Sequence, residues 1–455
     1  MSDTIAAIAT PAAPAGLGVI RLSGEGALAV AARVFRPADP ARTADRLAGY
    51  TAAYGHVYDA EGDIDECVLL VFRAPRSYTG ENVAELSCHG GLYLLRRVLR
   101  ACLTAGARLA QPGEFTRRAF LAGKMDLTQA ESVTALIAAD GRLAARTALA
   151  AHEGATYRRL QAVKDSLLAV EAQFGAYVDY PDEDIPELHP GALAQVIGDA
   201  RRTVGALLDT FDAGQVLREG VDTAIVGCPN VGKSTLMNAL SGCERSIVTE
   251  VEGTTRDVIE NTVRLGEVTL RLADTAGIRE TADPIESAGV EKARSRLRQA
   301  ALVLAVFDGS RPLTAADRAL AQASATATAI AVINKADQPE RTDRAYLESR
   351  FARVVTLSAR DGCGLEALAA AVADVTGVER LTAAEPVLST ERQRDCAARC
   401  LSCLEEADAA LSGGLTPDAV SVSLHGAISA ILELTGERAT EAVVDEVFAR
   451  FCVGK

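Results

Sequence analysis

One eight-residue segment limits the folds open to this chain more than any other feature. Residues 227–234 read Gly-Cys-Pro-Asn-Val-Gly-Lys-Ser, which fits G-x-x-x-x-G-K-[ST], directly after the β-rich run 223–226 and before helix-forming residues. In this order of strand, glycine-rich loop and helix, backbone N–H groups surround phosphate groups. The segment therefore predicts a P-loop, in which Lys233 reaches the β- and γ-phosphate oxygens and the Ser234 hydroxyl binds Mg²⁺.

Three later segments, each at the end of an apolar strand-like run, complete a nucleotide site and indicate that the bound nucleotide carries guanine. Asp274 and Gly277 stand in Asp-Thr-Ala-Gly, where the carboxylate can hold Mg²⁺ through water and the glycine N–H can contact the γ-phosphate. Asp337 closes Asn-Lys-Ala-Asp, and its carboxylate can accept hydrogen bonds from guanine N1–H and the exocyclic amine, which adenine does not offer. Residues 358–360, Ser-Ala-Arg, would back the base. Coincidence does not explain this order, so the sequence predicts guanine specificity.

The residues after Gly277 differ from those of Ras-like enzymes, in which a glutamine at this point orients the attacking water. Here Ile278 and Arg279 follow the glycine. The chain must therefore hydrolyse GTP slowly or use another polar group. Glu286 is one candidate for that group, and the alternative is that Glu286 is an ordinary solvated acid at the start of a helix.

The spacing of apolar residues separates the 455 residues into several regions. It predicts an α/β P-loop G domain, with a doubly wound and mostly parallel sheet, inserted in an all-α helical domain and preceded by an N-terminal α+β domain. The predicted boundaries are residues 1–120 for the N-terminal domain, 121–215 and 379–455 for the two parts of the helical domain, and 216–378 for the G domain. The predicted strands are residues 16–23, 67–72, 223–226, 269–273, 301–307, 329–333 and 354–357.

Composition narrows the class of protein. Apolar residues make up 49% and charged residues 24%, which is the balance of a globular chain with ample core material. We expect a cytoplasmic protein with no membrane partner, because no apolar run approaches the roughly 18 residues of a membrane span and no basic leader is visible. Ten cysteines are then expected to be reduced thiols. The net charge of −14 restricts any nucleic-acid contact to local patches.

Motifs spread over the whole chain carry a family resemblance. They are Thr-Gly-Glu (79–81), His-Gly-Gly (89–91), Pro-Gly-Glu-Phe (112–115), Gly-Lys-Met-Asp-Leu (123–127), Gly-Thr-Thr-Arg-Asp (253–257) and the ending Cys-Val-Gly-Lys (452–455). Together with Asn230 in the P-loop, they make the chain similar to the MnmE family, also called TrmE, of tRNA-modifying GTPases.

The resemblance implies a K⁺-stimulated GTPase that forms a homodimer through the N-terminal domain and whose G domains approach and separate during turnover. A cation at the phosphates supplies the positive charge that an arginine finger brings elsewhere. Glu286 aligns with the family's water-orienting glutamate and is a candidate catalytic residue. The implied metal ligands are Ser234 and Thr255 for Mg²⁺, and Asn230, Thr249, Val251 and Thr254 for K⁺. The implied GTP-binding residues are Asn230, Val231, Gly232, Lys233, Ser234, Thr235, Thr249, Glu250, Val251, Glu252, Gly253, Thr254, Thr255, Asp274, Thr275, Ala276, Gly277, Asn334, Lys335, Asp337, Ser358, Ala359 and Arg360.

The resemblance also implies a biosynthetic role. With the flavoprotein MnmG, in a heterotetramer, the family forms a 5-carboxymethylaminomethyl or aminomethyl group on the wobble uridine of certain tRNAs. The one-carbon unit comes from a tetrahydrofolate derivative, 5-formyl or 5,10-methylene, in the N-terminal domain. The implied folate-binding residues are Arg21, Glu85, Lys124 and Lys455. A pterin needs a carboxylate for its N–H edge and a glutamate tail needs cations, but without the resemblance Arg21, Glu85 and Lys124 would be taken as structural or solvated.

Cysteines raise two further questions. The family ending suggests that Cys452, the second candidate catalytic residue, lies near folate and uridine; whether it is a nucleophile depends on its pKa and stays open. Cys396, Cys400 and Cys403 have the spacing of radical-SAM iron–sulfur ligands, but the segment has the pattern of one continuous helix. We expect these three thiols to be small hydrophobic groups of a helix core.

Two other functions compete with this interpretation. One is a ribosome-assembly GTPase that acts as a switch without modification chemistry, although such a switch needs neither the Cys452 tail nor the folate-domain motifs. The other is a regulatory binding module with negligible turnover, from which K⁺-dependent hydrolysis would distinguish an enzyme.

Overall fold

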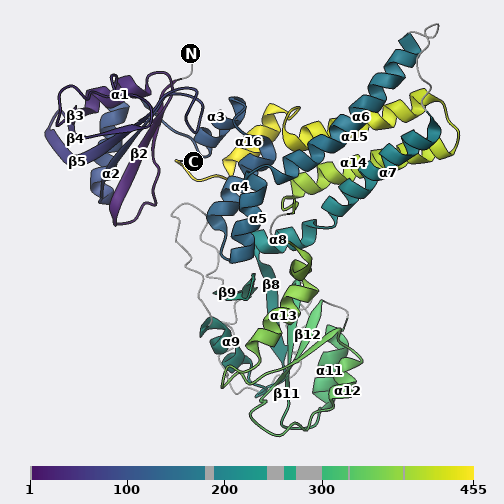
Figure 1. Ribbon diagram of the computed structural model, residues 1–455. Coiled ribbons are helices and arrows are strands. Elements are labelled where there is room, and N and C mark those ends of the chain that lie inside the picture. The colour runs from purple at the N-terminus through teal and green to yellow at the C-terminus, as the bar shows by residue number, and fades with distance from the viewer. Residues whose placement is uncertain are drawn as a thin grey trace. The chain divides into compact units, whose positions relative to one another are not determined.

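The computed structural model describes residues 3–179, 189–242, 261–272, 300–325, 328–382 and 385–454 (Figure 1). Contacts among the described residues divide the chain into two compact units. The N-terminal unit comprises residues 3–134 and 431–454, and the central unit comprises the described residues between 135 and 430. Within the described ranges, no helix is both long enough and apolar enough to cross a membrane.

The N-terminal unit is built on a seven-stranded sheet. Its strands are β1 (Ile5–Ile8), β2 (Ala15–Ser23), β3 (Phe35–Pro37), β4 (Thr51–Asp59), β5 (Gly62–Phe72), β6 (Val83–Gly90) and β7 (Arg108–Leu109), in the order β3-β4-β5-β6-β2-β1-β7. All neighbours pair antiparallel except β1 and β7, which are parallel. Helices α1 (Ala27–Val34) and α2 (Leu92–Thr104) belong to the same unit (Figure 1) and share one core with the sheet. Leu95 and Val98 of α2 are buried in that core at helical spacing.

A second small core brings the end of the chain into this unit. Helices α3 (Glu114–Leu121), α4 (Leu127–Ala138) and α16 (Glu441–Ala449) pack through Leu127, Phe448 and Phe451, all of which are buried. This packing groups residues 431–454 with the N-terminal unit. The boundaries predicted at residues 120, 215 and 378 stay predictions, since contacts divide the molecule differently.

The central unit contains a group of long helices. They are α5 (Arg142–His152), α6 (Ala155–Asp179), α7 (Pro190–Leu208), α8 (Phe211–Glu219), α14 (Glu391–Ser412) and α15 (Pro417–Thr435), the last of which extends into the N-terminal unit. An ion pair between Arg201 and Asp408 joins α7 to α14. A helix that precedes the six-stranded sheet in the sequence therefore packs against a helix that follows it. Cys396 and Cys400 are buried in α14 and Cys403 is partly buried, which confirms the helix-core interpretation.

Between α8 and α14 the chain forms a six-stranded sheet. Its strands are β8 (Val221–Gly227), β9 (Asn261–Leu265), β10 (Val268–Leu272), β11 (Leu302–Asp308), β12 (Ala329–Asn334) and β13 (Arg353–Thr356), in the order β13-β12-β11-β8-β10-β9. Only β9 runs antiparallel. Helices α9 (Lys233–Gly242) and α13 (Leu365–Val375) share one core with the sheet, and α11 (Ala315–Ser324) and α12 (Arg344–Glu348) share the other. The doubly wound, inserted G domain is confirmed.

Candidate functional site

The first candidate site lies along one edge of the central sheet. Strands β8, β11, β12 and β13 are mutually parallel, so their carboxyl ends meet at the same edge. The P-loop follows β8, Asp308 ends β11, Asn334 ends β12, and Ser358 lies two residues after β13. Ligands of open α/β sheets bind outside such carboxyl ends, and the structure therefore brings the predicted P-loop and guanine motifs together.

The P-loop has the backbone that phosphate binding requires. Asn230 and Gly232 have left-handed φ angles of 64° and 93°. A Cβ on Gly232 would lie 2.3 Å from Asn334 Nδ2, so only glycine fits there. Lys233 Nζ donates to the carbonyls of Gly227 at 2.9 Å and Cys228 at 2.8 Å, which holds its ammonium over the loop. Ser234 and Thr235, at the start of α9, are exposed and free of steric cover.

The side chain of Asn334 ties the guanine motifs to the P-loop. Its Nδ2 donates to the carbonyl of Val231 at 2.9 Å, and its Oδ1 accepts from the N–H of Ala359 at 3.0 Å. Asn334 is only 3% exposed, so both bonds are shielded from water. The Ser358 hydroxyl lies 3.3 Å from Asp337 Oδ1, while Asp337 itself is exposed and can accept from a base. One buried amide thus fixes three of the predicted segments relative to each other.

Asp308 is a residue of this edge that the sequence analysis did not identify. Its carboxylate accepts from Lys335 Nζ at 2.7 Å and from the Ser310 hydroxyl at 2.6 Å. Burial opposes ionisation, but the hydrogen bonds from Lys335 and Ser310 hold the pKa of Asp308 below its usual value. Lys335 has a left-handed φ of 69°, and Asp308 fixes its ammonium. An aspartate that ends the apolar strand beside the P-loop strand is the signal that could have revealed it.

A second candidate site lies in the N-terminal unit. Arg21 on β2 and Glu85 on β6 are directly opposite in the antiparallel register, and Arg21 Nε donates to Glu85 Oε1 at 2.8 Å. The Arg21 guanidinium carbon lies 5.9 Å from the centre of the Tyr78 ring and 5.8 Å from that of Phe115. A half-buried cation, a carboxylate and two rings therefore meet at one point of the sheet.

The carboxyl-terminal tail reaches the same point. Arg21 Nη1 donates to the carbonyl of Gly454 at 3.4 Å, although the two residues are 433 positions apart. Val453 forms an isolated antiparallel bridge with Pro112, and Cys452 is exposed. Of the predicted folate residues, Arg21 and Glu85 come together here. Lys124 is exposed and donates separately to the carbonyl of Pro75 at 3.1 Å.

Some predicted site residues lie outside the described residues. They are Thr249, Glu250, Val251, Glu252, Gly253, Thr254, Thr255, Asp274, Thr275, Ala276, Gly277, Glu286 and Lys455. Their predicted roles in K⁺, Mg²⁺, γ-phosphate and folate binding stay predictions.

Comparisons with known proteins agree over the full length. A family model described as the TrmE N-terminus of GTP-binding proteins matches residues 4–124, and one described as the MnmE helical domain matches residues 127–452. The tRNA modification GTPase MnmE of Heliobacterium modesticaldum is 42% identical over 466 residues, covering 100% of both chains. That of Chloroflexus aurantiacus is 42% identical over 459 residues, again covering 100% of both. That of Latilactobacillus sakei is 38% identical over 459 residues, covering 100% of this chain and 98% of the relative. On these matches the chain belongs to the MnmE family of tRNA modification GTPases.

Proposed function

We propose that this chain hydrolyses GTP to GDP and phosphate and that this hydrolysis serves the modification of tRNA at the wobble uridine. The observation that carries the proposal is the presence of two separate sites in a chain that matches full-length relatives. One is the nucleotide edge of the central sheet, and the other is the meeting of Arg21, Glu85 and the tail in the N-terminal unit. A GTPase switch alone would need only the first.

The described part of the nucleotide edge fits GTP with Mg²⁺. Backbone N–H groups of residues 230–234 would receive the phosphates, Lys233 would neutralise them, and the exposed Ser234 hydroxyl would contribute to Mg²⁺. Asp337 is available for the guanine N–H groups, and the Asn334 amide keeps its loop next to the P-loop. Mg²⁺ supplies charge neutralisation across the β- and γ-phosphates. The chain's own residues thus bind, orient and partly neutralise the nucleotide.

The hydrolytic step is proposed to use Glu286 and K⁺. Family membership supports both roles. The sequence agrees with them, because no glutamine follows Gly277 and an asparagine stands at position 230 of the P-loop. K⁺ held by Asn230 and by carbonyls of residues 249–254 would supply positive charge at the phosphates. Glu286 would orient the attacking water. Homodimerisation, with approach of the two G domains, belongs to the same proposal.

The one-carbon site is proposed to hold a tetrahydrofolate derivative, which supplies the carbon unit. Two features of the described residues support a pterin here. The Glu85 carboxylate, which could accept from the pterin N–H edge, is only 19% exposed, and its partner Arg21 lies beside the Tyr78 and Phe115 rings. Lys124 and Lys455 are proposed to receive the glutamate tail. The flavoprotein MnmG and tRNA are the proposed partners, in the cytoplasm.

The experiment that tests this function first is GTP hydrolysis in KCl and in NaCl at equal ionic strength. We expect strong stimulation by K⁺ in the wild type and loss of that stimulation in Glu286→Ala. Glu340→Ala, an exposed acid of the same domain, is the control and should hydrolyse GTP like the wild type. Equal rates in the two salts, or an unaffected Glu286 variant, would reject the mechanism and favour the ribosome-assembly switch.

A further inference from the structure

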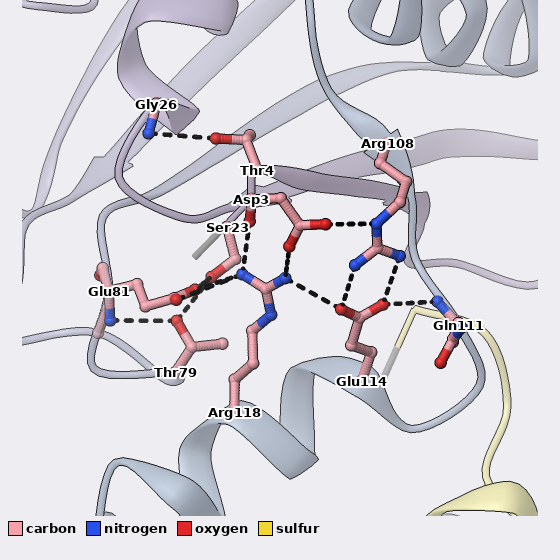
Figure 2. Close-up of polar contacts among 11 residues, drawn as sticks. Asp3, Thr4, Ser23, Gly26, Thr79, Glu81, Arg108, Gln111, Glu114 and Arg118 are labelled. Carbon is pink, nitrogen blue, oxygen red and sulfur yellow. Dashed lines mark hydrogen bonds and ion pairs between the residues drawn. The ribbon is translucent and has the colours of Figure 1, made fainter. Parts of the chain in front are cut away.

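Five charged side chains form a connected cluster behind the second site. Figure 2 shows these residues, which we call the Arg108–Arg118 cluster: Asp3, Glu81, Arg108, Glu114 and Arg118. Arg108 contacts Asp3 at 2.6 Å and Glu114 at 2.7 Å, and Arg118 contacts Asp3 at 2.8 Å, Glu114 at 3.0 Å and Glu81 at 3.1 Å. None of the five is among the predicted GTP-binding or folate-binding residues, although Glu81 and Glu114 stand in two of the motifs that carry the family resemblance.

Glu114 is the centre of this cluster. It is 9% exposed, and its carboxylate accepts from both guanidinium groups and from the N–H of Gln111 at 2.8 Å (Figure 2). Burial acts to raise the pKa of Glu114, but the bonds from Arg108, Gln111 and Arg118 together hold it below its usual value. The carboxylate thereby closes the turn of residues 111–113 on to the start of α3.

That turn carries the tail. The N–H of Gly113 donates to the carbonyl of Cys452 at 3.3 Å, and Pro112 pairs with Val453. Gly113 has a left-handed φ of 67°, and a Cβ there would lie 2.6 Å from the carbonyl oxygen of Phe448. Two residues further along, the carbonyl of Gly454 accepts from Arg21. The position of Cys452 therefore depends on a turn whose shape Glu114 maintains.

The other end of the cluster contacts the loop that carries Tyr78. Arg118 binds Glu81, and Glu81 accepts from the Ser23 hydroxyl at 2.7 Å, next to the buried Thr79 (Figure 2). The loop that these contacts fix carries Tyr78, whose ring lies beside Arg21. Glu114 thus connects to the tail through the neighbouring Gly113 and to the Tyr78 loop through Arg118, which contacts Glu81 of that loop directly.

We propose that Glu114 and Arg118 are positioning residues that hold the Cys452–Gly454 tail and the Tyr78 loop in contact with Arg21. A half-buried network of ion pairs adds little net stability compared with apolar packing. We therefore explain the network beside the tail by the geometry that it fixes and not by stability. The docking part of this inference stands on the contacts alone. Its consequence for tRNA modification rests on the proposed function.

Docking of the tail can be measured without folate, tRNA or GTP. A carboxypeptidase trims the tail, and mass spectrometry of the intact protein follows the loss of terminal residues. We expect Glu114→Gln to release the terminal residues about tenfold faster than the wild type, because it loses charge-assisted hydrogen bonds at the turn. The matched control is Glu446→Gln, which removes the same charge from an exposed pair with Arg450 on α16 and should trim like the wild type. Arg118→Lys keeps the charge but loses the fork of donors and should give an intermediate rate.

The same variants are then assayed for tRNA modification and for GTP hydrolysis. We expect Glu114→Gln to lower kcat for modification about tenfold, with the KM for tRNA and the GTPase rate unchanged, and Glu114→Asp to recover part of the loss. Circular dichroism and the K⁺-dependent GTPase rate show that each variant is folded. If Glu114→Gln unfolds, Arg118→Lys carries both measurements.

The outcomes separate the two proposals. Trimming at the wild-type rate in folded Glu114→Gln and Arg118→Lys would overturn the positioning role. Faster trimming with full modification activity would support the docking role and overturn its consequence for tRNA modification. Absence of modification by the wild type would reject the proposed function, and the trimming rates would still decide whether the cluster docks the tail.

Discussion

The nucleotide edge and the N-terminal site are assembled in different ways. At the nucleotide edge, each contributing segment follows a strand, and much of the geometry comes from backbone groups at left-handed positions such as Asn230, Gly232 and Lys335. At the N-terminal site, side chains from β2 and β6 meet a tail 433 residues away. The first site depends on local sequence, and the second depends on the tertiary structure around it.

The two sites are therefore sensitive to different kinds of substitution. A site made of backbone N–H groups fails when one small residue gains a Cβ, because the chain can no longer follow its path. A site made of side-chain ion pairs loses function in steps, since neighbouring pairs remain. Substitutions at the two sites should therefore differ in the size of their effects.

Gly232→Ala should give the largest loss. The added Cβ would lie 2.3 Å from Asn334 Nδ2 at a φ of 93°, so both the P-loop and the buried Asn334 bonds must shift. We expect affinity for a fluorescent GDP analogue to fall roughly 100-fold, which corresponds to about 3 kcal/mol. Gly242→Ala, at the end of α9 with open space around its Cβ position, should bind normally. Equal affinities would show that the loop is not held by this contact.

Arg21→Met should have an intermediate effect and act only on modification. It removes the bonds to Glu85 and to the Gly454 carbonyl but keeps a long apolar stem against Phe115. We expect tRNA modification to fall about 30-fold, through loss of charged hydrogen bonds worth roughly 2 kcal/mol, while GTP hydrolysis stays unchanged. The control is Arg36→Met, which breaks an exposed pair with Asp63 in the same sheet. A parallel loss of GTPase activity would contradict the separation of the two sites.

Asp308→Asn should weaken nucleotide binding modestly. Lys335 would keep a neutral partner in place of a carboxylate 2.7 Å away, and its stem would be held less firmly. We expect the Kd for GTP and GDP to rise about fivefold, or roughly 1 kcal/mol, measured by isothermal titration calorimetry. Asp343→Asn loses an exposed ion pair with Arg318 and keeps an oxygen that can accept from the N–H of Tyr346 at the start of α12; it serves as the matched variant and should not change the Kd.

The smallest effect is expected on thermal stability at low pH, through Asp3. Hydrogen bonding to Arg108 lowers the pKa of Asp3 to about 2, so ionised Asp3 stabilises the folded state above its unfolded pKa near 4, and the contribution disappears as pH falls toward 2. Asp3 is more than half exposed, which limits the gain. We expect the Tm of the wild type to exceed that of Asp3→Asn by about 1–2 °C at pH 5 and by nothing near pH 2. A difference that grows in acid would have the wrong sign.

Strands that end in a motif could be predicted from the sequence, and those of the G domain are confirmed within a few residues. In the G domain the strand that was missed is β9, which pairs antiparallel with β10 across Gly266 and Glu267; in the N-terminal unit β4 and β6 were missed as well. The signal for β9 was available: Val263 and Leu265 alternate with polar residues before the turn, as Val268 and Leu270 do after it. The short, edge and bridging strands β1, β3 and β7 have no such pattern, because tertiary contacts decide their pairing.

The two sites also differ in how far they could be predicted from the sequence. P-loop and guanine residues follow from spacing alone, since backbone geometry requires particular residue types at particular positions. Arg21 and Glu85 became candidates only through the family resemblance, and their ion pair follows from the β2–β6 register, which the sequence does not specify. Glu114, which stands in the quoted Pro-Gly-Glu-Phe motif, and Arg118 were not identified as site residues for the same reason. Each contacts partners that are distant in sequence, and a charged residue at the start of a helix has many ordinary explanations.

The 433-residue separation between Arg21 and Gly454 also has a consequence for how the protein is made. As the chain leaves the ribosome, the sheet core around Ile20 and Leu86 can form early, because its members lie within the first part of the sequence. The core that joins Leu127 to Phe448 must wait for nearly the whole chain. Synthesis order therefore delays completion of the N-terminal site until the G domain has already been translated, so an unfinished chain cannot present a finished site.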